Sequence, residues 1–247
     1  MKVEVWSDVF CPFCYIGKRK FEQALAEFPH RDEVEVVWHS FQLNPDAPRE
    51  FAGDVHEMLA SKYGMTRQRA QEMNDHVTRQ AAEVGLVYNL DKAQLTNSFD
   101  AHRLAHLAAA RGKQDEAEEA LFTAYFTDGR HLGRTETLAE IGAELGLDTE
   151  EVAATLASDA YAREVRADIA QARSFGINGV PFFIFDRTYA VSGAQPSEVF
   201  TTALERTWSD SHPLTLISAA DAQANGEVCT DDSCAVPTPQ QGVLARG

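Results

Sequence analysis

Cys11 and Cys14 stand three positions apart near the start of the chain, separated by Pro12 and Phe13. The residues before them, 2–7 (KVEVWS), place alternate side chains on opposite faces and predict a strand. After them, apolar residues recur at helical spacing until Pro29. A Cys-x-x-Cys motif between a strand and a helix start is typical of a redox site. It restricts the fold of this chain more than any other feature.

The predicted helix start gives the two thiols different roles. Only a thiolate attacks a disulfide, and the unpaired amides and positive dipole end of a helix N-terminus stabilise negative charge. We therefore expect Cys11 to be the nucleophile. Cys14 lies one turn further in, and we expect it to resolve the mixed disulfide.

Three neighbouring residues are candidates for tuning this pair. Pro12 suits the first helical turn, where its missing N–H costs little. Phe13 brings neither charge nor a hydrogen-bond donor, so the sequence does not fix whether the site oxidises or reduces its substrates. His39, in a second predicted strand, is a candidate neighbour of the thiols, although it is equally interpreted as an ordinary strand residue.

The order of predicted elements favours an α/β thioredoxin-like fold with a large inserted all-helical domain. Strand patterns occur at both ends of the chain, whereas the long middle part is charged, Ala-rich and helix-forming. The predicted strands are 2–7, 33–43, 181–185 and 188–192, followed by a helix from 196 to about 208. We predict a thioredoxin-like domain (1–45 and 175–208), an inserted helical domain (46–174) and a C-terminal extension (209–247).

Val180 and Pro181 form the second candidate element of the site, at the mouth of the third predicted strand. A cis bond between them would expose backbone groups beside the thiols, able to pair with an extended substrate. An ordinary trans proline at the start of an edge strand is the alternative. The strand-helix-strand frame with its Cys-x-x-Cys motif favours the cis form.

Charge and hydropathy narrow the classes of partner. The formal net charge of the 247 residues is -16, which disfavours nucleic acid and anionic membrane surfaces. The N-terminal residues lack the pattern of a secretory signal, and no apolar run approaches the roughly 20 residues that span a bilayer. We therefore expect a cytoplasmic protein with no nucleic-acid or membrane partner.

Cys229 and Cys234 make a second close pair in the C-terminal extension. They are interpreted as a structural disulfide, as unpaired thiols, or as a second redox centre that exchanges with Cys11 and Cys14. A permanent disulfide is disfavoured in a reducing compartment. We favour the exchange, because this extension has little other reason to contain two thiols.

Metal binding is the main alternative for these residues. Both cysteine pairs together could supply four thiolates to zinc. Zinc would then occupy the nucleophile, and a Cys-x4-Cys pair holds a metal ion less tightly than the shorter spacing of a zinc knuckle. His102 and His106, four apart on a predicted helix, lack a third ligand nearby in the sequence. We predict neither a metal site nor a cofactor.

Four segments resemble one family of known proteins. SDVFCPFCYIGK, FQLNP, NSFDAHRLAHLA and GINGVPFFIF are similar to the DsbA family of thiol-disulfide oxidoreductases, and within it to the cytoplasmic FrnE-type branch. The resemblance extends to about Trp208. It implies that Cys11 and Cys14 are the redox pair, that Pro181 is the cis-proline and that the helical insertion is a lid over the site. Some FrnE-type proteins also have a distal Cys-x4-Cys pair.

These observations favour a thiol-disulfide oxidoreductase. Its expected partners are protein thiols and disulfides, with small thiols such as glutathione as further candidates. One alternative is a glutathione-dependent transferase or isomerase of the kappa-class type, against which Cys11 weighs because those relatives have serine there. The other is a holdase chaperone whose thiols only sense oxidants.

Overall fold

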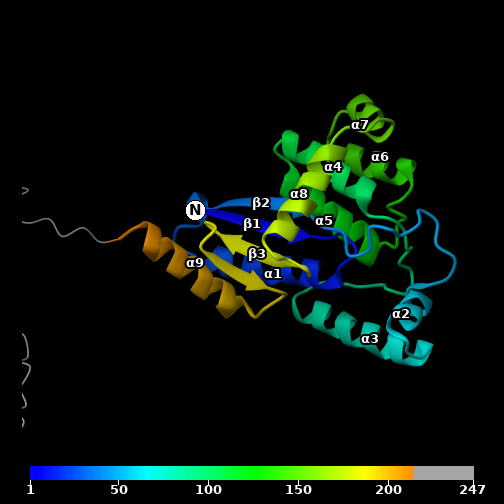
Figure 1. Ribbon diagram of the computed structural model, residues 1–247, viewed down its shortest axis with the longest axis horizontal. Helices are drawn as coiled ribbons and strands as arrows, with labels where there is room; N and C mark the ends of the chain where they lie inside the picture. The colour runs from blue at the N-terminus through cyan, green and yellow to red at the C-terminus, as the bar shows by residue number, and fades with distance from the viewer. Residues whose placement is uncertain (214–247) are drawn as a thin grey trace, which may run out of the picture. The chain divides into compact units, whose positions relative to one another are not determined.

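Four strands form one mixed sheet in the computed structural model, which describes residues 1–213 (Figure 1). The sheet order is β2-β1-β3-β4, with β1 parallel to β2 and antiparallel to β3, and β3 antiparallel to β4. The strands are β1 (Lys2–Ser7), β2 (Glu35–Ser40), β3 (Phe182–Phe185) and β4 (Tyr189–Ser192). This confirms the four predicted strands, although β2 is shorter than the predicted 33–43.

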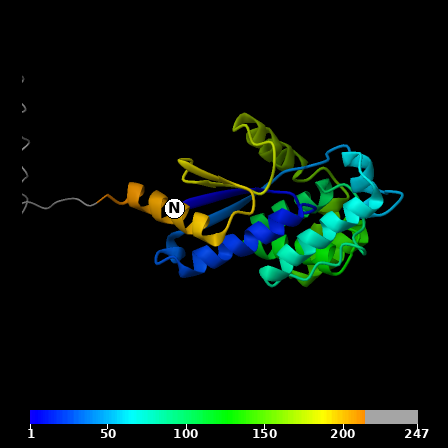
Figure 2. The ribbon, with the colours of Figure 1, turned by 90° about the horizontal axis from the view of Figure 1, so that it is seen from below.

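Helices cover both faces of this sheet (Figure 2). They are α1 (Pro12–Glu27) and α9 (Ser197–Ser211) on one face and α8 (Ala162–Ser174) on the other. Val3 and Val5 pack in a buried cluster with apolar residues of α1 and α9, whereas Trp6 packs with Ala172 of α8. The alternation predicted for β1 is therefore confirmed, with both faces buried.

The helices between β2 and α8 share one hydrophobic core. They are α2 (Val55–Tyr63), α3 (Arg67–Glu83), α4 (Phe99–Ala110), α5 (Gln114–Phe122), α6 (Thr135–Glu144) and α7 (Thr149–Leu156), with a π-helical turn at Thr123–Thr127. A 3-10 turn at Arg31–Glu33 precedes β2. The same core includes Cys11, Cys14 and Tyr15. The cysteine end of α1 thus lies where the helical insertion packs against the thioredoxin-like part.

A buried lysine fixes α1 against α5. Lys18 is 1% exposed, and its ammonium group pairs with Glu22 on its own helix and with Asp115 (3.1 Å) and Glu119 (3.3 Å) of α5. The ammonium also lies 5.9 Å from the centre of the Trp38 ring. A buried charge is tolerated only when it is paired, so this cluster holds the two helices in one relative position.

The C-terminal helix is longer than predicted. α9 continues to Ser211, so the first residues assigned to the C-terminal extension, from 209, belong to this helix. Cys229 and Cys234 lie outside the described residues. Within residues 1–213, none of the helices combines the length and the apolar composition needed to cross a bilayer.

Candidate functional site

Cys11 is the N-cap residue immediately before α1. Its backbone is extended (φ -87°, ψ 112°), Pro12 occupies the first helical turn, and the Cys11 carbonyl accepts a hydrogen bond from the Cys14 N–H at 2.9 Å. The first amides of the helix therefore point toward this residue, as the sequence predicted. The thiol donates a hydrogen bond to the Val180 carbonyl oxygen at 3.4 Å. A group that develops negative charge at this sulfur is stabilised by the helix end.

The Val180–Pro181 peptide bond is cis, as expected from the sequence, and it lies against α1. A Cβ atom built on Gly17 would come within 2.9 Å of the Pro181 ring, so this close approach requires glycine. On its other side, the Pro181 carbonyl accepts a hydrogen bond from the Gly193 N–H at 2.8 Å. Pro181 is thus held between the first helix and the β4 end of the sheet.

Cys14 is fully buried behind Cys11, and both are free thiols. Burial, together with the neighbouring Cys11 sulfur, raises the pKa of the Cys14 thiol well above its ordinary value. The Ser7 hydroxyl is also buried here, and it has no oxygen or nitrogen partner among the described residues. The two thiols therefore differ in their surroundings. Cys11 precedes the helix, whereas Cys14 is fully buried and its raised pKa keeps it protonated.

Two residues that the sequence did not single out hold the Cys-x-x-Cys loop. The Tyr88 hydroxyl, from the segment after α3, donates a hydrogen bond to the Pro12 carbonyl at 2.7 Å. Asp8 accepts hydrogen bonds from the backbone N–H groups of Phe10 (3.2 Å) and Leu43 (2.7 Å). Asp8 could have been found from its place in the SDVFC segment, whereas no local pattern identifies Tyr88.

The buried imidazole ring of His102 lies next to the Asp8 carboxylate. The His102 ring nitrogen Nε2 lies 2.9 Å from the Phe41 carbonyl and 3.7 Å from the Asp8 carboxylate. Burial alone would lower the pKa of His102, but Asp8, the nearby charge of Glu118 and the Phe41 carbonyl outweigh it, so this pKa lies above its ordinary value. His102 therefore helps to position Asp8 and, through it, the loop that precedes Cys11.

His39 does not contact the thiols. Its ring stacks on Trp6, its Nδ1 lies 2.8 Å from Asp168 of α8, and its Nε2 lies 3.4 Å from Glu4. His106 also pairs with Asp168, at 3.0 Å, rather than with His102. Through Asp168, these histidines link β2 and α4 to α8. The described part of the chain contains no cluster of side chains that could hold a metal ion.

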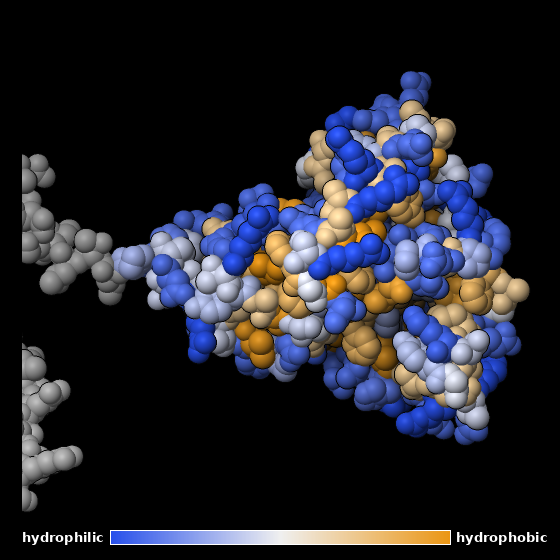
Figure 3. Space-filling view, viewed as in Figure 1, coloured by the Kyte–Doolittle hydropathy of each residue, from blue (hydrophilic) through white to orange (hydrophobic). Residues whose placement is uncertain are grey.

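A cavity of about 280 Å³ opens beside Cys11. Its lining comes from the start of α1, the segment after β2, α2, α3 and the segment before α4, and it is mostly apolar. Figure 3 shows apolar side chains in the region where α2 and α3 approach the rest of the molecule. A substrate that reaches the Cys11 sulfur would therefore lie against apolar side chains.

Comparison with known proteins agrees with this geometry. Residues 2–205 match the family model described as DSBA-like thioredoxin domain. The solved structure of a probable DsbA oxidoreductase from Streptomyces coelicolor is similar over 96% of this chain and 100% of its own, with 48% sequence identity and a TM-score of 0.83. These matches confirm the predicted α/β thioredoxin-like fold.

Two more distant relatives extend the comparison. The uncharacterized protein YwbO of Bacillus subtilis (strain 168) is 29% identical over 204 residues, which are 82% of this chain and 94% of that protein. The cytosolic disulfide reductase DsbM from Pseudomonas aeruginosa has 18% identity and a TM-score of 0.59, covering 84% of this chain and 98% of its own. The latter similarity is one of fold.

Proposed function

Because this chain belongs to the DsbA-like thioredoxin domain family, as its sequence motifs predicted, we propose that it exchanges disulfides with protein substrates through Cys11 and Cys14. The position of the Cys11 sulfur is the observation on which the proposal rests. This atom lies at the N-terminus of α1, 3.4 Å from the Val180 carbonyl and beside an apolar cavity. In this proposal the backbone at Val180 and Pro181 pairs with the extended substrate.

Reduction of a substrate disulfide proceeds in two exchange steps. First, the Cys11 thiolate attacks one substrate sulfur, the substrate S–S bond breaks, and the other substrate sulfur leaves as a thiolate that takes up a proton. Cys14 then loses its proton and attacks the Cys11 sulfur, so that the Cys11–Cys14 bond forms and the first substrate sulfur leaves. Two electrons pass to the substrate, and an external thiol reductant restores the pair. Oxidation of a substrate dithiol is the reverse sequence.

The difference between the two thiols supports this order of events. The raised pKa of Cys14 keeps its thiol protonated while Cys11 attacks. Because Cys14 is fully buried, a bulky substrate reaches only the Cys11 sulfur. The substrate must therefore be released by Cys14 from within the protein.

We also place the chain in the FrnE-type branch, on the sequence resemblance of its motifs. In that proposal Cys229 and Cys234 are a second redox pair. One of their thiolates attacks the Cys11–Cys14 disulfide, and the other resolves the mixed disulfide, so that Cys11 and Cys14 are reduced and a Cys229–Cys234 disulfide forms, which an external thiol then reduces. These two cysteines lie outside the described residues, so the proposal rests on the sequence. Replacing both by serine should slow repeated turnover but leave the first attack by Cys11 unchanged.

Insulin reduction by dithiothreitol tests the central proposal. The wild type should accelerate the reaction, and Cys11→Ser should abolish the acceleration because serine is not an effective nucleophile toward disulfides. Cys14→Ser should accumulate a mixed disulfide, seen by mass spectrometry without reductant. The Cys229→Ser/Cys234→Ser variant also loses two thiols but keeps Cys11 and Cys14, so it should still form the mixed disulfide in the first attack. Undiminished activity of Cys11→Ser would contradict the proposal.

A further inference from the structure

Exposed apolar side chains are concentrated around the cavity beside Cys11. Eight large apolar side chains are more than a third exposed within residues 1–213. Five of them line this cavity, namely Phe13, Leu43, Phe51, Tyr63 and Met73. Scattered exposed apolar residues are ordinary, but a cluster of this kind marks an interaction surface. We call this surface the α1–α3 groove.

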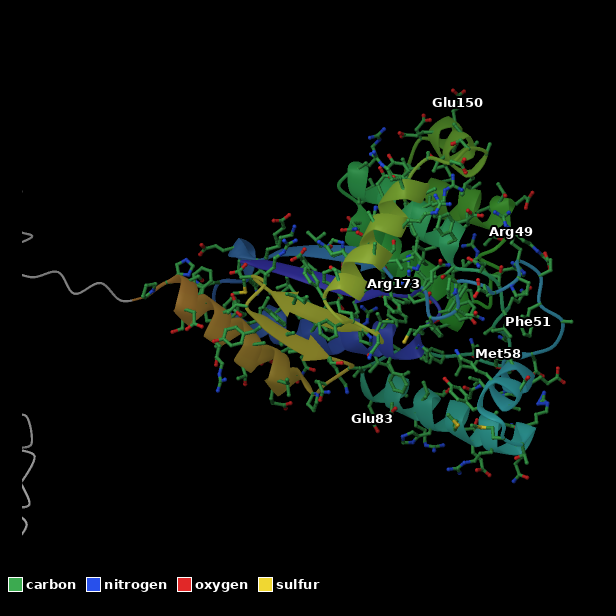
Figure 4. The ribbon with its side chains drawn as sticks, viewed as in Figure 1. Arg49, Phe51, Met58, Glu83, Glu150 and Arg173 are labelled. Carbon is green, nitrogen blue, oxygen red and sulfur yellow. The ribbon has the colours of Figure 1, made fainter. Side chains whose placement is uncertain are left out.

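Two walls form the α1–α3 groove. One consists of Cys11, Pro12 and Phe13 at the start of α1, and the other of side chains from α2 and α3. Phe51, just before α2, and Met58, within α2, lie at the same end of the molecule (Figure 4) and line the same cavity. The reactive sulfur therefore lies at one side of the groove rather than apart from it.

The α2–α3 wall is built as a preformed hairpin. The buried side chains of His56 and Asn74 join the two helices through a 3.0 Å hydrogen bond. Asp54 caps α2 by accepting from the Glu57 N–H at 2.9 Å, and it also pairs with Arg67 at the start of α3. A wall that is already ordered loses little conformational entropy on binding, so its apolar contacts contribute more fully to affinity.

The groove differs in charge from the rest of the protein. The chain has a formal net charge of -16. Among the described residues that line the groove, Asp8 is the one acidic residue, and both of its carboxylate oxygens are bonded to backbone N–H groups. Lys62 is exposed at the groove, and no carboxylate of the described residues lies within ion-pair distance of it. Its ammonium lies 5.7 Å from the centre of the Tyr63 ring. The positive charge of Lys62 therefore favours an occupant that has an acidic group.

We propose that the α1–α3 groove binds an extended segment of the substrate protein in which a bulky apolar residue and an acidic residue accompany the reacting cysteine. This inference rests on the proposed function. The apolar side chain of the substrate packs between Phe13 and Met73, and the acidic one pairs with Lys62, while the substrate sulfur reaches Cys11. The groove thus selects among cysteine-containing segments by the residues around the cysteine.

Single-turnover attack on matched peptides tests the inference. Each peptide contains one cysteine in a mixed disulfide with thionitrobenzoate, and it is mixed with reduced Cys14→Ala protein. The Cys11 thiolate attacks the peptide sulfur, a peptide–Cys11 disulfide forms, and the coloured thionitrobenzoate anion is released and measured. A peptide with leucine near the cysteine should react about tenfold faster than one with serine. Glutamate in place of lysine should add about threefold.

Variants of the groove assign this preference to its residues. Met73→Ser should remove most of the leucine preference, because an apolar contact is lost. Lys62→Glu should reverse the preference between glutamate and lysine peptides. Val199→Ser is the matched control, since Val199 is equally exposed (40%) but lies on α9 and does not line the groove, and it should leave both preferences unchanged.

A small neutral disulfide separates failure of the inference from failure of the proposed function. Bis(2-hydroxyethyl) disulfide has neither an apolar side chain nor a charge, so its rate measures the attack by Cys11 without the proposed groove contacts, and Val199→Ser should react with it at the wild-type rate. If the protein reacts with this compound and with all peptides at equal rates, the inference is overturned while the proposed function stands. If it reacts with none of them, the proposed function itself fails.

Discussion

Glu118 is a fully buried carboxyl group of α5 that should make the stability of this protein depend on pH. The residue is 3% exposed, and its Oε2 atom has no hydrogen-bond partner among the described residues. Burial raises the pKa of Glu118 to about 7 from the ordinary value of 4.5, although the nearby positive charges of His102 and Lys18 favour the ionised form. We therefore expect Glu118→Gln to change how stability varies with pH.

The sign and size follow from the two pKa values. Between them, the folded protein holds a proton that the unfolded chain has released, so the free energy of unfolding falls as the pH rises. The slope is about 1.4 kcal/mol per pH unit between the two pKa values and falls to zero above the higher one, so the loss from about pH 5 to about pH 8.5 amounts to about 2.5 kcal/mol. Glutamine does not titrate. Relative to the wild type, Glu118→Gln should therefore gain about 2.5 kcal/mol over this range.

Urea unfolding measures this gain. The buried indole rings of Trp6 and Trp38 should report unfolding by fluorescence, and both proteins are compared at the two pH values. Glu116→Gln is the matched control, because Glu116 lies on the same helix but is exposed. Its effect should stay within about 0.5 kcal/mol at both pH values. A difference between Glu118→Gln and the wild type that does not change with pH would refute the reasoning.

Two further substitutions test the sheet and its ion pairs. Phe21→Ala removes a ring packed 5.5 Å from Phe183 and 5.8 Å from Phe200, so urea unfolding should show a loss of about 3–5 kcal/mol, and wild-type stability would contradict this packing. Arg187→Ala leaves the buried Glu4 carboxylate without its guanidinium bonds and should lower the free energy of unfolding at neutral pH. Arg187 lowers the pKa of Glu4, and the stability from this pair disappears as the pH falls through that lowered value. A loss from Arg187→Ala that is unchanged in acid would therefore count against this explanation.

Much of the fold follows from short-range patterns. The alternation in β1 predicted which residues face α1 and α9, because side chains of a strand alternate between its two faces. The place of Cys11 at a helix start followed from the strand before it and the helical periodicity after it. The four strands and the long helical insertion were likewise predicted, whereas the ends of β2 and α9 were not placed correctly, since helix and strand ends depend weakly on periodicity.

The interpretation of His39 shows where local patterns stop. A histidine at the end of β2 was a reasonable neighbour for thiols at the end of the adjacent β1. Its ring instead meets Asp168, which lies 129 residues away in the sequence and comes from α8. The packing of α8 on the sheet decides this contact, and no spacing near His39 encodes it.

The sequence by itself determined the strand, the helix start, the different positions of Cys11 and Cys14 and the proline after Val180, because each depends on residues that are neighbours along the chain. Tertiary structure alone decided that Tyr88 holds the Pro12 carbonyl, that Asp8 rests on His102, and that five exposed apolar side chains gather beside one sulfur. These contacts join segments many residues apart. The way in which the helical insertion packs against α1 brings them together, and this packing depends on the shape of the whole buried core.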